Sequence, residues 1–354
     1  MAELELTTEA VENCPLCGSD KKKFLFWTYD RLYRLPGKFG TLQCEQCSLI
    51  RLSPRPTVNT IGIYYPDDYG AYKTPLLTIE QVRDTNRPFG SLRNAVRDSV
   101  ISGLGYDTGK LTGWQRAFRL PITKLAYKKA TYGFGDLFPK YVSNGTALEV
   151  GCGNGKYLNF LKYYGWKVVG VDLSPHAAKS AKENFDIDVF LGQLEDSPFP
   201  DESFDYIHLS HVVEHFYDPL ETMKKVRNLL KPNGIVYIEV PNAEGIGAQM
   251  SGKFWYGWDA PRHLFMFTPE TLKKTLDEAE LNLTKMRTTV WDSFSWANTY
   301  IEEEKSGEKL AIRPSVKQGD YLKVKGQGIA AQVKHYLKPL NGDIISCWAT
   351  RMKE

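Results

Sequence analysis

From residue 141 onward, short apolar runs alternate with longer segments whose apolar residues recur at helical spacing. This pattern predicts strands at 146–150, 167–171, 188–191, 204–209, 234–240, 281–290 and 343–351, and helices at 156–164, 175–184 and 218–230. A turn at Lys-Pro-Asn-Gly234 is expected to stop the last of these helices. The alternation predicts an α/β fold with a mostly parallel sheet, helices on both faces and ligands at the carboxyl ends of the strands.

The earlier part of the chain is organised around cysteines. Four of the six form two Cys-x-x-Cys pairs, Cys14 with Cys17 and Cys44 with Cys47. Two such turns can close a tetrahedral shell around zinc, so we expect a structural zinc site that helps to fold a small module. The 26 residues between the pairs exceed the usual ribbon spacing, and residues 24–40 are therefore predicted to form a hairpin with a loop. A redox dithiol or unpaired thiols are the alternatives.

Between this module and residue 141 the predictions are simpler. Residues 48–57 suggest an edge strand that prolines end, and a tyrosine-rich loop at 64–72 suits either a solvated cover or a contact with a polar ligand. Helical spacing recurs at 92–100, and a second helix is expected at 122–130.

The composition shows that basic residues are concentrated in one part of the chain. Apolar residues make up 42% of the chain, enough for a core, and the formal net charge is +3. Residues 87–140 hold ten Lys/Arg against three Asp/Glu, which suits a solvated face or a grip on phosphates of a nucleotide-linked substrate, an RNA or an anionic membrane. The N-terminus lacks a signal-peptide pattern, and no apolar run is long enough to span a membrane. We expect a soluble cytoplasmic protein.

The clearest chemical signal is the glycine-rich turn after the strand at 146–150, where Glu149 precedes glycines at 151, 153 and 155. A dinucleotide fingerprint would need glycine at 156, and the chain has Lys156 there. Asp172 ends the next strand, where a carboxylate can accept both hydroxyls of a ribose. Gln193 follows the third strand, where a side-chain amide can read an adenine edge.

Five blocks then occur in the order typical of one family: Leu148-Glu-Val-Gly-Cys-Gly-Asn-Gly155, Gly170-Val-Asp-Leu-Ser174, Gly192 to Asp205, His211-Val-Val-Glu-His215 and Leu229-Leu-Lys-Pro-Asn-Gly234. On these blocks, residues 141–290 resemble class I S-adenosylmethionine-dependent methyltransferases, which implies a Rossmann-like sheet of seven strands. The resemblance implies a set of cofactor-binding residues: Glu149, Gly151 and Gly153 along the methionine, Asp172 at the ribose with Leu173 beside it, Gln193 and the backbone of Leu194 at the adenine, and Ser210 beside the sulfonium. The family often has Asp or Asn where this chain has Gln193.

A narrower resemblance covers the N-terminus. A four-cysteine module, a Pro-x-Pro turn and a tyrosine-rich segment ahead of this domain are similar to the layout of bacterial methyltransferases that act on sugars in polysaccharide and natural-product pathways. Residues 258–272 also resemble the acceptor-side loop of that group. The predicted organisation is a zinc module at 10–70, a helical basic linker at 71–140 and a methyltransferase domain at 141–354.

The same resemblance places the acceptor near a set of histidines. His211, His215 and His263 are candidates for a general base, which is needed only if the acceptor is a hydroxyl or a C–H beside a carbonyl. Tyr256 and Arg262 could orient a sugar or its phosphate. Each histidine could instead serve only to support the loop by hydrogen bonds.

Residues 211–215 also fit the H-x-x-E-H pattern of zinc peptidases, an interpretation that their place after a strand argues against. A divalent ion on His211, Glu214 and His215 stays open, as does a purely structural Glu214 bonded to backbone amides.

The predicted acceptor is a small molecule, a nucleotide-linked or activated sugar. An RNA methyltransferase and a binding protein without catalysis are the alternatives, and the overall composition does not favour RNA. Residues 292–340 form a predicted insertion before the last strand, helical near 296–304 and 329–337, that suits a cap or a dimer face. The oligomeric state stays open.

Overall fold

The computed structural model describes residues 6–66, 90–107, 138–291, 294–307 and 321–352. Most of the tyrosine-rich loop and the whole helix expected at 122–130 therefore lie outside the described residues. The chain divides into two compact units, the first formed by residues 1–69, 209–228 and 236–354 and the second by residues 70–208 and 229–235. The domain boundaries expected at residues 70 and 140 stay predictions.

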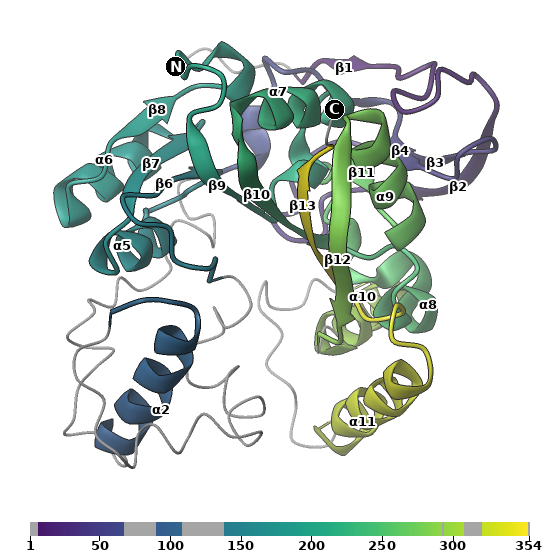
Figure 1. The fold of residues 1–354 in the computed structure, drawn as a ribbon. Coiled ribbons are helices and arrows are strands. Elements are labelled where there is room, and N and C mark those ends of the chain that lie inside the picture. The colour runs from purple at the N-terminus through teal and green to yellow at the C-terminus, as the bar shows by residue number, and fades with distance from the viewer. Residues whose placement is uncertain (1–5, 67–89, 108–137, 292–293, 308–320, 353–354) are drawn as a thin grey trace. The chain divides into compact units, whose positions relative to one another are not determined.

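The largest sheet has seven strands in the order β12-β13-β10-β9-β6-β7-β8 (Figure 1). Their bounds are β6 Thr146–Val150, β7 Lys167–Asp172, β8 Val189–Leu191, β9 Phe204–Ser210, β10 Leu230–Pro241, β12 Leu281–Thr289 and β13 Ile344–Arg351. Strands β6, β7 and β8 are parallel, whereas β12 and β13 are antiparallel, so the sheet is mixed. The prediction of a Rossmann-like sheet of seven strands is confirmed.

The second unit packs two helices on this sheet, α5 Lys156–Tyr163 and α6 Pro175–Phe185. Leu158 and Leu161 are fully buried because their spacing places both on the face of α5 that meets the sheet. Helix α6 begins where the Ser174 hydroxyl accepts a hydrogen bond from the Ala177 amide, with proline at the first turn. The same unit contains α2 Gly90–Gly103, in the region where helical spacing was noted.

The Lys-Pro-Asn-Gly segment at 231–234 is part of a strand and not the predicted turn. Residues 231–234 were predicted to end a helix in a turn, but helix α7 Pro219–Leu229 ends earlier and β10 begins at Leu230. Leu230 is fully buried, and Lys231 binds the Asp205 carboxylate of β9 at 2.6 Å. These two contacts hold the Lys-Pro-Asn-Gly segment extended.

In the described part of the chain, the first unit holds α7 and four further helices: α8 Ile246–Ser251, α9 Pro269–Glu278, α10 Phe294–Ser306 and α11 Tyr321–Leu337. Thr268 caps α9 with reciprocal hydrogen bonds to Thr271, and Leu272 and Leu276 are fully buried. Helices α10 and α11 match the helical stretches expected within 292–340. No helix in the described part of the chain is long and apolar enough to cross a membrane.

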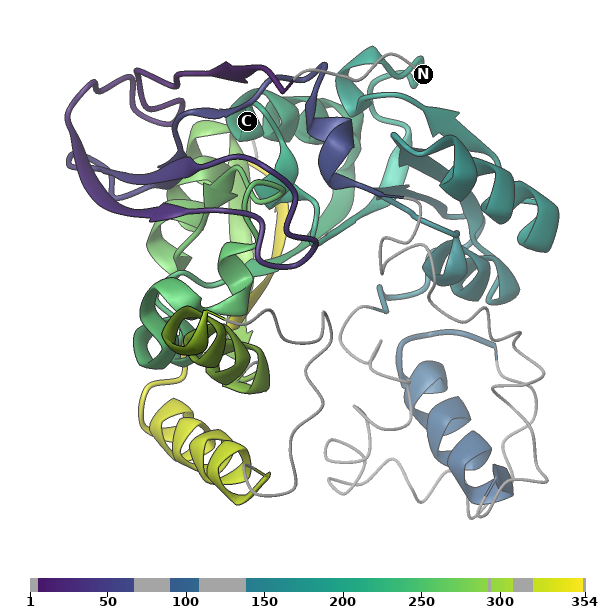
Figure 2. The same cartoon turned by 180° about the vertical axis from the view of Figure 1, so that it is seen from behind.

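The cysteine-rich segment contributes three strands to a second sheet, β2 Lys22–Thr28, β3 Phe39–Cys44 and β4 Ile50–Leu52 (purple in Figure 2). The fourth strand, β11 Phe265–Met266, comes from a later part of the chain. Strands β2 and β3 form the predicted hairpin. The prediction of an edge strand after Cys47 is wrong, because β4 pairs with β3 on one side and β11 on the other. Two-residue strands β1 Thr8–Glu9 and β5 Arg55–Pro56 pair separately.

Candidate functional site

The glycine-rich turn joins β6 to α5 and has an unusual backbone. Gly151, Gly153 and Gly155 have φ angles of 68°, 51° and 74°, which are strained for any residue with a Cβ atom. Among the described residues, a Cβ at Gly153 would meet no atom within 4 Å, so glycine is needed there for its conformation and the turn is open on that side. At Gly155 an added Cβ would lie 2.9 Å from the Cβ of Ala181, so close helix packing requires glycine as well.

Asp172, at the end of β7, holds this turn in place. Its Oδ2 accepts a hydrogen bond from the Gly153 amide at 2.8 Å, and its Oδ1 accepts one from the Ser174 amide at 2.9 Å. Burial raises the pKa of Asp172, while these backbone hydrogen bonds act in the opposite direction. A carboxylate has about four acceptor positions, so Asp172 keeps acceptor capacity for a ribose hydroxyl beside these backbone bonds.

Glu149 lies in β6 and is 7% exposed. Its Oε1 is 3.1 Å from His208 Nδ1, whereas Oε2 is buried and has no hydrogen-bond partner among the described residues. Burial raises the pKa of Glu149, and His208 opposes that shift. A buried acceptor without a donor suits a cationic ligand group, such as the ammonium group of a methionine moiety.

Sequence reasoning missed His208. Its ring stacks on Tyr157 at 4.1 Å between centroids, and its Nδ1 orients the Glu149 carboxylate. The sequence held an indication of its role. His208 lies in the apolar run that forms β9, where it is buried, and a buried imidazole needs a polar partner.

The remaining predicted cofactor residues occupy different environments. Leu173 is 69% exposed and Leu191 is 51% exposed, leaving apolar surface near the ends of β7 and β8. Gln193 precedes the short turn Leu194–Asp196, and the Leu194 side chain is buried. Ser210 belongs to the first unit, where its hydroxyl donates to Glu239 Oε1 at 3.4 Å. The cofactor contacts of these residues stay predictions.

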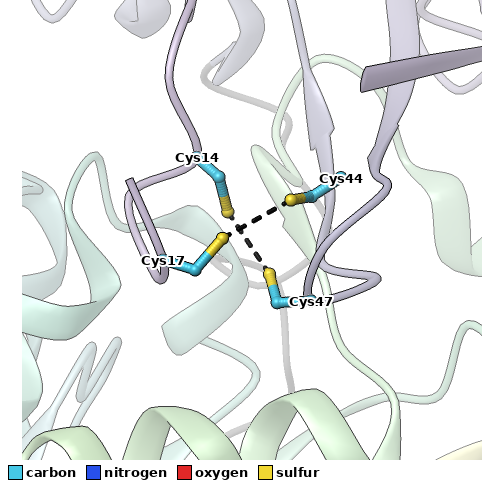
Figure 3. Close-up of side chains that lie close together, drawn as sticks. All are labelled: Cys14, Cys17, Cys44 and Cys47. Atoms are coloured by element: carbon cyan, nitrogen blue, oxygen red, sulfur yellow. Dashed lines mark hydrogen bonds between the residues drawn. The ribbon is translucent and has the colours of Figure 1, made fainter. Parts of the chain in front are cut away.

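The four predicted metal-binding cysteines converge on one point (Figure 3). The Sγ atoms of Cys14 and Cys47 are 3.5 Å apart, and so are those of Cys17 and Cys44. Zn–S bonds of about 2.3 Å in a tetrahedron separate the sulfur atoms by about 3.8 Å, so the donor set fits zinc. Tight turns present both pairs, with Gly18 bonded to the Cys14 carbonyl and Ser48 to the Cys44 carbonyl.

The three candidate histidines lie together in the first unit. His211 follows β9, and His215 ends a short 3-10 turn at Val213–His215. His263 comes from the loop before β11, and its ring centroid lies 4.8 Å from that of His215 in an edge-to-face arrangement. The segment from 211 to 215 is therefore not a helix that carries two histidines on one face, which excludes the peptidase arrangement.

Glu214 lies at the centre of this histidine cluster. Its side chain is fully buried, with Oε1 3.4 Å from His211 Nδ1 and 3.8 Å from His263 Nε2. Neither carboxylate oxygen has a hydrogen-bond partner among the described residues. The alternative of a structural acid bonded to backbone amides is wrong.

The histidines differ in protonation. Burial opposes a charge on His211, but Glu214 and Glu239 outweigh it and raise the pKa of His211 to about 10. Burial and the neighbouring His263 lower the pKa of His215 to about 4. Burial disfavours the charged form of Glu239, yet His211 and two hydroxyl donors bring its pKa to about 2. His211 is thus a cation paired with carboxylates, and His215 is neutral.

Two other predicted acceptor residues have different surroundings. The Tyr256 ring packs against Trp291 and Trp296, with centroids at 5.2 and 4.9 Å. The Arg262 guanidinium is fully buried and binds Asp259, Asp30 and the Tyr64 carbonyl. The suggestion that Arg262 orients a substrate phosphate is wrong, because protein acceptors already occupy its donors.

The mixed seven-stranded sheet and the glycine turn with Asp172 at the next strand end define a Rossmann-like methyltransferase fold. A family model described as a methyltransferase domain matches residues 126–286. The matched region, less than half of the chain, is thus similar to a methyltransferase domain.

Several curated proteins are similar to this region. An uncharacterised protein of Methanocaldococcus jannaschii is 31% identical over 111 residues, which are 31% of this chain and 52% of that protein. A demethylmenaquinone methyltransferase of Chlorobaculum parvum is 35% identical over 96 residues, 27% of this chain and 40% of the relative. A ubiquinone biosynthesis O-methyltransferase of Cereibacter sphaeroides is 27% identical over 180 residues, 47% of this chain and 73% of the relative. The chain thus spans about half or less of the length of the first two.

Proposed function

We propose that this protein transfers a methyl group from S-adenosylmethionine to a small-molecule acceptor, a nucleotide-linked or otherwise activated sugar. The observation that carries the proposal is the pair of acidic side chains at adjacent strand ends. Glu149 has a buried oxygen without a donor among the described residues, and Asp172 keeps free acceptor positions while it anchors the glycine turn.

Glu149, the glycine turn and Asp172, which we call the cofactor half-site, each suit one part of the cofactor. Glu149 would bind the ammonium group, and the open backbone at Gly153 allows close approach of the methionine moiety. Asp172 would accept both ribose hydroxyls. The exposed side chains of Leu173 and Leu191 offer an apolar surface for the adenine.

S-adenosylmethionine supplies a methyl group on a sulfonium, which is already a good leaving group. Positioning then contributes much of the rate, and the protein needs chemistry of its own only to prepare the acceptor. We assign that task to the cluster of His211, His215, His263 and Glu214, with Tyr256 as a further candidate for contact with the acceptor.

The choice of a sugar rests on the layout of the chain, with a zinc-type cysteine module ahead of the methyltransferase domain. An exposed aromatic surface agrees with it, since Trp291 is 40% exposed beside Tyr256 and an apolar ring face can pack there. The similar ubiquinone biosynthesis protein is named as an O-methyltransferase, and we favour oxygen as the methylated atom here too.

The test is incubation of the protein with S-adenosylmethionine and a pool of nucleotide sugars, read out by mass spectrometry. The proposal expects one species to gain the mass of a CH₂ group with the wild-type protein and none with Asp172→Asn. If calorimetry shows no cofactor binding, the proposal fails. Methylation of RNA together with salt-sensitive retention of RNA would instead support the alternative acceptor.

A further inference from the structure

Glu214, His215 and His263 bring three ligand atoms together at one point of the first unit. One carboxylate oxygen and one nitrogen from each imidazole all lie within 4.8 Å of one another. Glu214 and His263 are buried, and His215 is half-buried. The sequence pattern alone suggested His211 as the third member, whereas the fold brings in His263 from a loop 48 residues after His215.

The hydrogen bonds of the two imidazoles fix which nitrogen faces the carboxylate. His215 Nδ1 lies 2.9 Å from the Arg262 carbonyl, and His263 Nδ1 lies 2.8 Å from the Gly257 carbonyl. A carbonyl can only accept, so each Nδ1 carries the proton and each Nε2 has a free lone pair. Imidazoles that bind metals are oriented in this way, by donation from the other ring nitrogen.

The carboxylate is a second observation that suits a metal ion. Glu214 is fully buried, and its Oε1 has a cationic neighbour in His211 Nδ1 at 3.4 Å, but neither oxygen has a hydrogen-bond partner in the described part of the chain. A buried carboxylate without donors is costly, and a metal ion bound to it would supply the direct contact that His211 does not make at this distance. Its Oε1 lies 3.8 Å from His263 Nε2, on the side of the free lone pair.

We propose that Glu214, His215 and His263 form a binding site for a divalent first-row transition-metal ion. Two imidazoles and one carboxylate suit zinc, iron or manganese, and three protein ligands leave positions open for other molecules. Metal–ligand bonds of about 2.1 Å place the donor atoms about 3.0 to 3.4 Å apart, so binding would draw the three side chains together. The short turn at 213–215 and the loop before β11 carry these side chains.

The role of the ion rests on the methyl transfer proposed above. An acceptor oxygen would occupy an open position, where coordination makes its hydroxyl more acidic. The hydroxyl proton leaves to water, the oxygen forms its bond to the methyl carbon as the carbon–sulfur bond breaks, and the sulfonium becomes a neutral thioether. His215 and His263 are then ligands rather than bases.

The experiment measures binding of Mn²⁺ to the full chain after one equivalent of zinc has been added, which the four thiolates take up in preference to the histidine cluster. Manganese prefers oxygen and nitrogen ligands over thiolates, so it reports the histidine cluster. Electron paramagnetic resonance of free Mn²⁺ is expected to show one bound ion per chain. Glu214→Gln and His263→Gln should each weaken binding by more than about 100-fold, because losing even an outer partner costs about 10 to 100-fold.

His176→Gln is the matched control, since it removes an exposed imidazole on α6 and should leave Mn²⁺ affinity unchanged. Circular dichroism and zinc content show whether the Glu214 and His263 variants are folded. Absence of Mn²⁺ binding to the wild type, or equal affinity in both folded variants, would overturn the metal site. The affinity for S-adenosylmethionine is measured on the same samples. A protein that binds Mn²⁺ but not S-adenosylmethionine would refute the proposed function and support the metal site.

Discussion

Replacing Asp172 by Asn removes the charge of the central carboxylate and little else. Asp172 accepts hydrogen bonds from two backbone amides, at 2.8 and 2.9 Å. The Asn side chain keeps one acceptor oxygen and places an NH₂ group against the other amide, so one bond to the turn and one to the ribose are lost. Hydrogen bonds to a charged group contribute about 1.5 to 3 kcal/mol each, so losing the ribose bond weakens binding by about 1.5 to 3 kcal/mol, whereas the lost turn bond acts on the free protein as well. The Kd for S-adenosylmethionine should rise about 10- to 100-fold.

Isothermal titration calorimetry with S-adenosylmethionine measures this change directly. Asp188→Asn is the matched control, because it makes the same chemical change on a side chain that is 83% exposed at the start of the neighbouring strand. Zinc content should be the same in both variants. If a folded Asp172→Asn protein binds the cofactor within about threefold of the wild type, the reasoning on the half-site is wrong.

Three further predictions concern metal, pH and stability. Cys44→Ser should lose bound zinc while Cys347→Ser, a buried cysteine outside the cluster, should keep it, as measured by atomic absorption. Because burial raises the pKa of Glu149 and the cofactor ammonium needs its charged form, affinity should fall as pH drops through that raised pKa, and Glu149→Gln should flatten a calorimetric pH series. Arg262→Met should cost about 3 to 5 kcal/mol of unfolding free energy in urea, since it leaves buried carboxylates unpaired. Arg227→Met breaks an exposed ion pair and should cost no more than about 1 kcal/mol.

Local patterns were enough to predict most of the large sheet. Apolar runs and helical spacing show which face of a strand or helix is buried, and this pattern can be seen within each segment alone. The pairing of β4 with β11 could not be predicted in this way. Strand β11 has only two residues, Phe265 and Met266, and it follows β4 by more than 200 residues along the chain. So short a strand has no periodicity, and its partner is determined by tertiary packing.

In the candidate site, too, residues close in sequence could be predicted and those brought together by tertiary packing could not. Glu149 and Asp172 could be proposed from sequence because they lie near the ends of two strands that pair in parallel, and each strand is followed by a recognisable turn. The histidine cluster combines segments that are distant in sequence, so the pattern at 211–215 suggested His211 as a ligand. Its imidazole lies between two carboxylates, 3.4 Å from an oxygen of Glu214 and 3.4 Å from one of Glu239, while His263 approaches Glu214 to 3.8 Å. Glu239, which binds His211, was missed because one acid in an apolar strand carries no motif.

The cysteine module has a further consequence for the histidine cluster. The loop that carries His263 is held at Arg262, which binds Asp30 in the loop of the β2–β3 hairpin at 2.8 Å. Directly after His263, β11 pairs with β4, the strand that follows Cys47. Both anchors belong to the segment that carries the four cysteines, so zinc bound there would stabilise the position of His263 without contacting it. Chelation of zinc should therefore weaken Mn²⁺ binding at Glu214, His215 and His263 while leaving S-adenosylmethionine affinity at Glu149 and Asp172 intact. Loss of cofactor affinity without loss of Mn²⁺ binding would show that the module supports the cofactor half-site instead.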